Sequence, residues 1–113
     1  MSTQTMQAGT QATAFRFKAF VAPMTLEGRS ISPHIANLAT RCVLEAVSKK
    51  TARGNLHGAL TEGIWRAVVE EKTPVCKTRE EVHDMSYRLL DRLLTRLKKE
   101  GLIFYENREW HLA

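Results

Sequence analysis

A leucine-rich amphipathic segment between Thr78 and Gly101 constrains this chain more than any other feature. Thr78 and Glu81 form a capping box, in which each side chain accepts a hydrogen bond from the other residue's backbone N–H. Gly101 is suited to the left-handed conformation that ends many helices. Because the apolar side chains cover about half of a helix circumference at ~100° per residue, this helix must contact at least two neighbours. The apolar positions are Val82, Met85, Leu89, Leu90, Leu93, Leu94 and Leu97.

Two more helices are predicted upstream of this segment. Ser32 is a favoured N-cap, and Pro33 is tolerated in the first turn, where its missing N–H has no helical partner in any case. Apolar residues then recur at helical spacing to about Lys49, and a second helix is predicted over Leu60–Glu71. Loops are expected at residues 23–30, 51–58 and 72–77.

The C-terminal residues predict a β-hairpin. Residues 102–105 and 109–112 are the two expected strands, and residues 106–108 form the turn, where Asn107 tolerates a positive φ. An isolated hairpin is only marginally stable in water, so this one must dock on the helices. Its expected docking residues are Ile103, Trp110 and Leu112.

The N-terminal residues are expected to lie outside the folded domain. Residues 1–14 contain no charge and little apolar surface, which predicts a disordered tail. Residues 15–31 are expected to form an extended arm or strand, because apolar and basic residues alternate from Phe15 to Val21. The remaining residues, 32–113, form one domain that is mainly α with a small C-terminal β-hairpin.

The positive charge of the chain is concentrated in two segments. The 113 residues contain 17 Lys and Arg against 12 Asp and Glu, a net charge of +5. The segment from Tyr87 to Lys99 holds five basic residues and one acid, and a second basic segment runs from Arg41 to Arg53. If the first of these segments is helical, five of its polar residues form a stripe within a sector of about 100° beside the leucine face. The stripe residues are Arg88, Arg92, Thr95, Arg96 and Lys99.

Several classes of function have no support in the residues. The sequence contains no nucleophile elbow, phosphate-binding glycine loop or helical zinc motif, so we expect neither an enzyme nor a cofactor. Cys42 and Cys76 are expected to be reduced thiols without a metal. No apolar stretch approaches the ~18 residues that a membrane span needs, and no secretory signal is recognisable, which predicts a cytoplasmic protein without membrane contact.

The run from Met85 to Ile103 resembles the recognition helix of a winged helix-turn-helix protein. Such helices begin with a hydrophobic residue and a serine, here Met85 and Ser86, and continue with an Arg-Leu-Leu-x-Arg-Leu stretch, here residues 88–93. They leave through Gly-Leu-Ile, here residues 101–103. Residues 107–112 are similar to the return strand of the family's wing. The resemblance covers residues 78–113, about a third of the chain.

The resemblance implies three helices plus a wing that bind double-stranded DNA. Residues 86–99 would lie in the major groove with Ser86 as their cap, and the wing, residues 103–112, would contact the flanking backbone. Arginine suits this role because its guanidinium group can bind guanine or phosphate through two hydrogen bonds. The implied DNA-binding residues, together with the basic stripe, are Tyr87, Arg88, Asp91, Arg92, Thr95, Arg96, Lys99, Asn107 and Arg108.

Two departures from the family's pattern leave alternatives open. The segment from Thr78 to Asp84 is short for a positioning helix, and Asp84 stands where a glycine is expected. Residues 78–85 therefore form either a separate helix or the start of one continuous helix to Lys99, with residues 60–71 as the positioning helix. Leu89 occupies a position that is often polar and faces DNA. That suits a more buried helix or a partner other than DNA.

We therefore expect a small, homodimeric, sequence-selective DNA-binding protein. It would act as a transcriptional regulator or as an accessory protein of replication or a mobile element. The alternative is a winged-helix adaptor or inhibitor that binds a protein partner through Phe15, Phe17 and Phe104. The equal number of acidic and basic residues over 78–113, seven of each, suits this second function.

Overall fold

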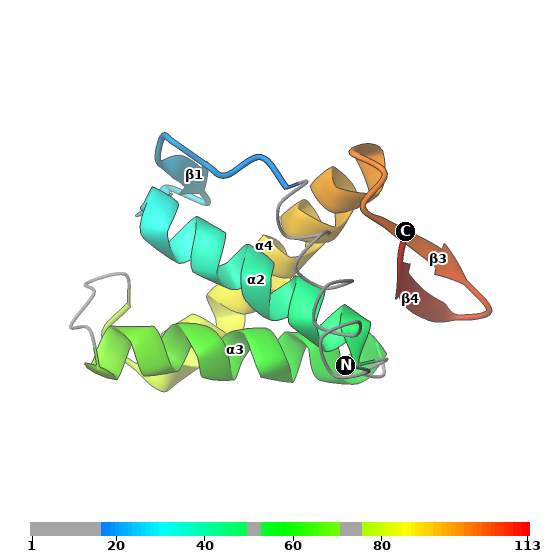
Figure 1. Ribbon diagram of the computed structural model, residues 1–113. Coiled ribbons are helices and arrows are strands. Elements are labelled where there is room, and N and C mark those ends of the chain that lie inside the picture. Colours follow the sequence, from blue (N-terminus) through cyan, green and yellow to red (C-terminus); the bar gives the residue numbers. More distant parts are fainter. Residues whose placement is uncertain (1–16, 50–52, 71–75) are drawn as a thin grey trace, which may run out of the picture.

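The core of the protein is centred on α4 (Arg79–Lys99), the helix predicted from the leucine pattern. The computed structural model describes residues 17–49, 53–70 and 76–113, so the expected tail over residues 1–14 lies outside the described residues. Within these ranges α2 (Pro33–Ser48) and α3 (Arg53–Glu70) are the other helices, and α3 packs against both α2 and α4 (Figure 1). Every apolar residue predicted for the core face of α4 is buried. The mainly helical fold is confirmed.

The helix ends follow the predicted caps. Ser32 Oγ accepts a hydrogen bond from Ile35 N (3.3 Å), and Thr78 Oγ1 accepts one from Glu81 N (3.1 Å). Gly101 has a φ of 75°, and Leu102 N donates to Leu97 O (3.0 Å), as in a glycine-terminated helix. Residues 78–85 therefore belong to one continuous helix, the second of the two alternatives.

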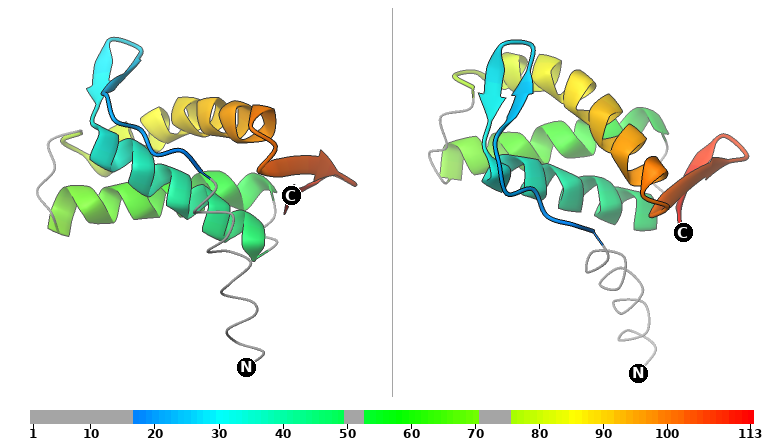
Figure 2. Two further views of the ribbon diagram at one scale, coloured as in Figure 1. Left: turned by 45° about the horizontal axis from the view of Figure 1, so that its top comes forward. Right: turned by 90° about the horizontal axis from the view of Figure 1, so that it is seen from above.

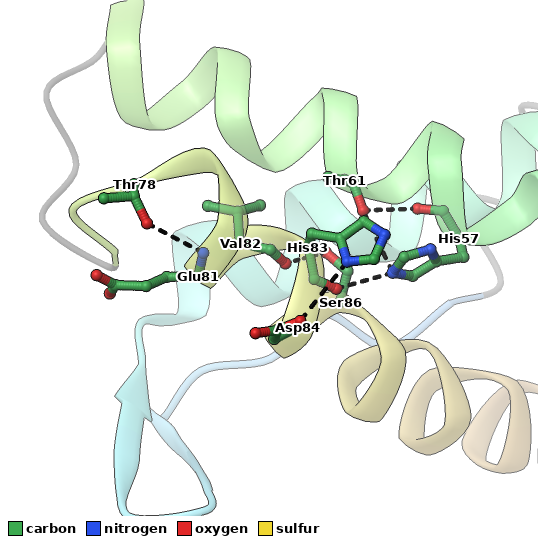
Figure 3. Close-up of polar contacts among 8 residues, drawn as sticks. All are labelled: His57, Thr61, Thr78, Glu81, Val82, His83, Asp84 and Ser86. Atoms are coloured by element: carbon green, nitrogen blue, oxygen red, sulfur yellow. Dashed lines mark hydrogen bonds and ion pairs between the residues drawn. The ribbon is translucent and has the colours of Figure 1, made fainter.

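Ser86 does not cap a helix, contrary to what the resemblance implies. It lies inside α4, where its buried hydroxyl donates to Val82 O at 2.7 Å (Figure 3). The cap at Thr78 begins the helix two turns earlier, because Val82 and Met85 extend the buried face to that point. The second half of the predicted capping box differs, because the Glu81 carboxylate accepts from Lys77 N (3.4 Å) rather than from Thr78 N.

The helix α3 begins at Arg53, whereas the sequence predicted a loop up to residue 58 and a helix from Leu60. The reason lies in the packing of Leu56, which is 1% exposed and continues the buried face of Leu60 and Ile64 by one turn. Gly54 and Gly58 each cost about 1 kcal/mol in a helix, and burial of a leucine side chain contributes roughly 1.5–3 kcal/mol, which is enough to offset both. Packing therefore overrides the low helix propensity of this segment.

A second hairpin replaces the loop predicted over residues 23–30. Strands β1 (Met24–Leu26) and β2 (Arg29–Ile31) are antiparallel, and Leu26 pairs with Arg29 across a two-residue turn. The turn residues Glu27 and Gly28 have φ values of 54° and 77°, the conformation of a type I′ hairpin turn. Leu26 and Ile31 are buried and dock the hairpin on the core. The described residues preceding β1 (residues 17–23) form an extended arm without a strand.

The predicted C-terminal hairpin is confirmed. Strands β3 (Ile103–Glu106) and β4 (Glu109–Leu112) are antiparallel, with a turn in which Asn107 and Arg108 have φ values of 53° and 64°. Ile103 is buried, and Trp110 and Leu112 pack against the core. The hairpin projects from the C-terminal end of α4 (Figure 2).

The crossing of α2 and α3 predicts a substitution whose effect depends on its neighbour. A Cβ atom added at Gly63 would lie 2.5 Å from Cys42 Sγ but 3.7 Å from Cys42 Cβ. We expect Gly63→Ala to lower the free energy of unfolding in the native chain, because the contact with the sulfur outweighs the helix gain. In a Cys42→Ala background the same change should raise it by up to about 1 kcal/mol, the helix preference for alanine over glycine.

Urea denaturation of the four chains of this double-mutant cycle measures the difference. An equal effect of Gly63→Ala in both backgrounds would contradict the close contact between the two helices.

Candidate nucleic-acid interface

A groove runs along α4 beside the β1–β2 hairpin and collects most of the residues predicted to bind DNA. It has a volume of about 690 Å³. Of the nine predicted residues, six line this groove and the others lie elsewhere. Leu26 and Glu27 of the β1–β2 hairpin form its opposite wall. The lining residues from α4 are Arg88, Asp91, Arg92, Thr95, Arg96 and Lys99.

Arg96 binds the N-terminal arm. Its guanidinium carbon lies 4.0 Å from the ring centroid of Phe20 and 5.3 Å from that of Phe17. Arg96 Nη2 donates to Lys18 O (3.2 Å), and Nε donates to a carboxylate oxygen of Glu100 (3.1 Å). With 29% of its side chain exposed, Arg96 is held by these contacts as part of the fold.

Asn37 of α2 holds the same arm from the other side. Its side-chain amide nitrogen donates to Phe20 O (3.1 Å), and its side-chain oxygen accepts from Phe20 N (2.8 Å). The arm thus runs from β1 across α2 toward the C-terminal half of α4 (Figure 1). Nothing in the sequence pattern pointed to Asn37. In the sequence, Phe20 stood out only because it interrupts the alternation of apolar and basic residues in the arm.

The other two arginines of the stripe bind the β1–β2 hairpin. Arg92 Nη1 donates to Thr25 O (2.9 Å), and Arg88 forms an ion pair with Glu27 in the turn. Each arginine therefore contacts a different part of residues 17–31. The backbone carbonyl of Thr25 and the carboxylate of Glu27 are partners that sequence reasoning did not identify, because residues 23–30 were expected to be a loop.

The groove continues into a second hollow of opposite charge, toward the N-terminal end of α4. This hollow has a volume of about 590 Å³ and shares Glu27, Arg88 and Asp91 with the groove. Four acidic and two basic side chains line the hollow, whereas the groove has four basic and two acidic ones. The surface is thus basic over the C-terminal half of α4 and acidic over its N-terminal half. The acidic residues of the hollow are Glu27, Glu81, Asp84 and Asp91.

Tyr87 lies on the flank of α4 that faces α3. Its ring stacks on His57 of α3, with centroids 3.6 Å apart and an angle of 14° between the planes. His57 Nε2 donates to His83 O (2.8 Å; Figure 3). The His83 ring packs edge-on against the rings of both His57 and Tyr87. Half of Tyr87 remains exposed, so it borders the surface but not the basic groove.

Two predicted cations keep free side chains. Lys99 lines the groove, and Arg108 stands exposed at the tip of the β3–β4 hairpin beside Asn107. Neither side chain has a hydrogen bond or ion pair with any residue that the structure describes. On the same hairpin, Phe104 stacks on His111 with centroids 5.0 Å apart. The free cations therefore lie at the C-terminal end of α4 and at the neighbouring hairpin tip.

The cysteines offer little chemistry. Cys42 and Cys76 are free, and no group of three His, Cys, Asp or Glu residues in the described ranges is arranged to hold a metal ion. Burial raises the pKa of the Cys42 thiol, with Glu45 adding to this effect and Arg41 opposing it. Burial likewise raises the pKa of Cys76. Both thiols are therefore protonated at neutral pH.

None of the described helices is long and apolar enough to cross a bilayer.

Comparison with known proteins found no relative of this chain: no protein-family model, curated protein or solved structure matches it.

The contacts of Arg96 predict a stability effect that its position on a polar helix face did not suggest. We expect Arg96→Gln to lower the free energy of unfolding by about 1–2 kcal/mol, because it removes a cation–π contact and the hydrogen bond to the arm. Lys98→Gln, on the same turn of α4, should change it by less than about 0.5 kcal/mol. Urea denaturation compares the two variants, and equal effects would contradict a structural role for Arg96.

Proposed function

We propose that this chain is a winged helix-turn-helix protein that binds double-stranded DNA. In this proposal α2, α3 and α4 are the three helices, and the β3–β4 hairpin is the wing. The order of elements supports the assignment, because the hairpin follows the long basic helix directly through Gly101. The helix α4 would enter the major groove, and Arg108 at the hairpin tip would contact the flanking backbone.

The gathering of four basic side chains on one groove carries this proposal. Arginine and lysine side chains supply most of the affinity for DNA by neutralising phosphates. Three of the four are arginines, and the fourth, Lys99, has no partner among the described residues. The two acids of the groove, Glu27 and Asp91, would disfavour indiscriminate binding of phosphate. The proposal is therefore selective binding.

In this proposal the residues that contact bases are exposed side chains of α4. Leu89 is fully buried, so the position that is often polar in the family belongs to the core here. Asp91 and Thr95 are exposed on α4 and line the groove. Carboxylates accept hydrogen bonds from cytosine, and threonine can contact several bases. Because α4 is continuous from residue 79, α3 takes the role of the positioning helix.

The biological setting follows from the same proposal. A small DNA-binding protein of this kind would act in the cytoplasm as a transcriptional regulator or as an accessory of replication or a mobile element. A homodimer would match a palindromic site, in which two half-sites lie about one helical turn apart.

One observation favours the second candidate, a winged-helix module that binds a protein. Phe104 and Tyr105 of β3 are each 40% exposed, although they are large and apolar. Exposed aromatic residues are enriched at protein interfaces. Binding at such a surface would depend weakly on salt, which separates the two functions in a titration.

DNA binding predicts a salt dependence that reports the number of phosphate contacts. We expect binding of a random-sequence duplex, measured by fluorescence anisotropy, to weaken steeply with salt. The slope of log affinity against log salt is negative. The double variant Lys99→Gln with Arg108→Asn should reduce its magnitude by about 1 for each lost contact. Asparagine is chosen at position 108 because it tolerates the positive φ there.

Arg66→Gln is the matched control. Arg66 is exposed on α3, near Cys42 of α2, and does not line the groove. It should leave the slope unchanged. Absence of binding at low salt, or an equal loss in the control, would contradict DNA binding by α4 and the wing.

A further inference from the structure

We propose that the arm (residues 17–23) and the Glu27 carboxylate form an internal cover, which DNA phosphates displace from Arg96 and Arg88 of α4. This inference rests on the proposed DNA binding and adds an autoinhibitory contact to it. The β1–β2 hairpin itself stays docked, because Leu26 and Ile31 are buried in the core.

The backbone of Glu27 is the first observation. Its φ of 54° falls in the left-handed region, where the first residue of a type I′ turn is usually Asn, Asp or Gly. Glutamate is not favoured in this conformation. Its carboxylate nevertheless pairs with Arg88 and lines the basic groove. An acidic group thus occupies the groove at a point where a phosphate oxygen would bind.

The partners of the other arginines are the second observation. Arg92 and Arg96 donate to the backbone carbonyl oxygens of Thr25 and Lys18, which are neutral acceptors. A hydrogen bond from a guanidinium group to a phosphate has charge on both sides and is stronger than one to a neutral carbonyl. At Arg96 a phosphate would replace the neutral carbonyl of Lys18 by a charged acceptor, and this gain offsets the loss of the ring contacts of Phe17 and Phe20.

The weak attachment of the arm is the third observation. Residues 18, 19 and 21–23 are exposed, Val21 to 92%, and only Phe17 and Phe20 of the arm pack, partly buried, against the core. The arm has no regular secondary structure, and its hydrogen bonds to the rest of the described protein come from Asn37 and Arg96. Segments with few buried contacts open at low free energy without unfolding the core. The arm can therefore leave α4 while the helices stay packed.

Asn37→Ala separates the cover from the DNA-binding surface. It removes both hydrogen bonds to Phe20 without changing charge, and Asn37 does not line the groove. Asn55→Ala, at an exposed position of α3, is the matched control. We expect Asn37→Ala to bind a random-sequence 20-base-pair duplex about three- to tenfold more tightly than the native chain, and Asn55→Ala to bind as the native chain does.

A second pair of variants tests the acidic part of the cover. Glu27→Gln and Glu45→Gln each remove an exposed carboxylate that forms an ion pair with a basic side chain. The partner of Glu27 is Arg88, and the partner of Glu45 is Lys49. Only Glu27 lies in the groove. We expect about two- to fivefold tighter binding for Glu27→Gln and a smaller change for Glu45→Gln.

Amide hydrogen exchange at Phe20, whose N–H donates to Asn37 Oδ1, reports the arm directly when it is measured with and without the duplex. Faster exchange on DNA binding, together with tighter binding by Asn37→Ala, supports the cover. If the native chain binds the duplex but Asn37→Ala binds equally well and the arm exchanges no faster on binding, the cover is overturned and the DNA-binding function stands. If neither chain binds at low salt, both proposals fall.

Discussion

The burial of the leucine face of α4 is the interaction on which the rest of the structure depends. This helix presents apolar side chains over half its circumference, and no single neighbour could cover them. The helix α3 packs along α4, α2 packs against both α3 and α4, and the β3–β4 hairpin follows the end of α4. Removal of α4 would leave each of these elements with an exposed apolar surface.

The orientation of that face also determines what the arginines do. Arginine recurs every four residues from Arg88 to Arg96, with leucines between, so the arginine stripe lies directly beside the buried face. Arg96 is close enough to the core to meet Phe17 and Phe20, whereas Lys99, one turn further along, extends into the groove. The same stripe therefore contributes to stability at one position and offers free positive charge at another.

The sequence predicted the elements whose signals are local. The capping box at Thr78, the glycine at the end of α4 and the turn at Asn107 each depend on a few neighbouring residues. The start of α3 and the β1–β2 hairpin were missed, because Leu56, Leu26 and Ile31 are stabilised by contacts that are distant in the sequence. For the site, the helix pattern predicted which α4 residues share a face. It could not predict that Thr25, Glu27 and Lys18 would contact three of them.

The distance along the chain between the arm and α4 has a consequence for the order of folding. The hydrogen bonds from Arg92 to Thr25 and from Arg96 to Lys18 join residues 67 and 78 positions apart. Contacts of such separation carry a large loop-closure entropy, so they form late, after α3 and α4 have paired locally. The arm is then the last part of the described chain to settle and the first to detach under mild denaturant. We therefore expect mild denaturant to release this segment at a concentration at which the three helices are still packed.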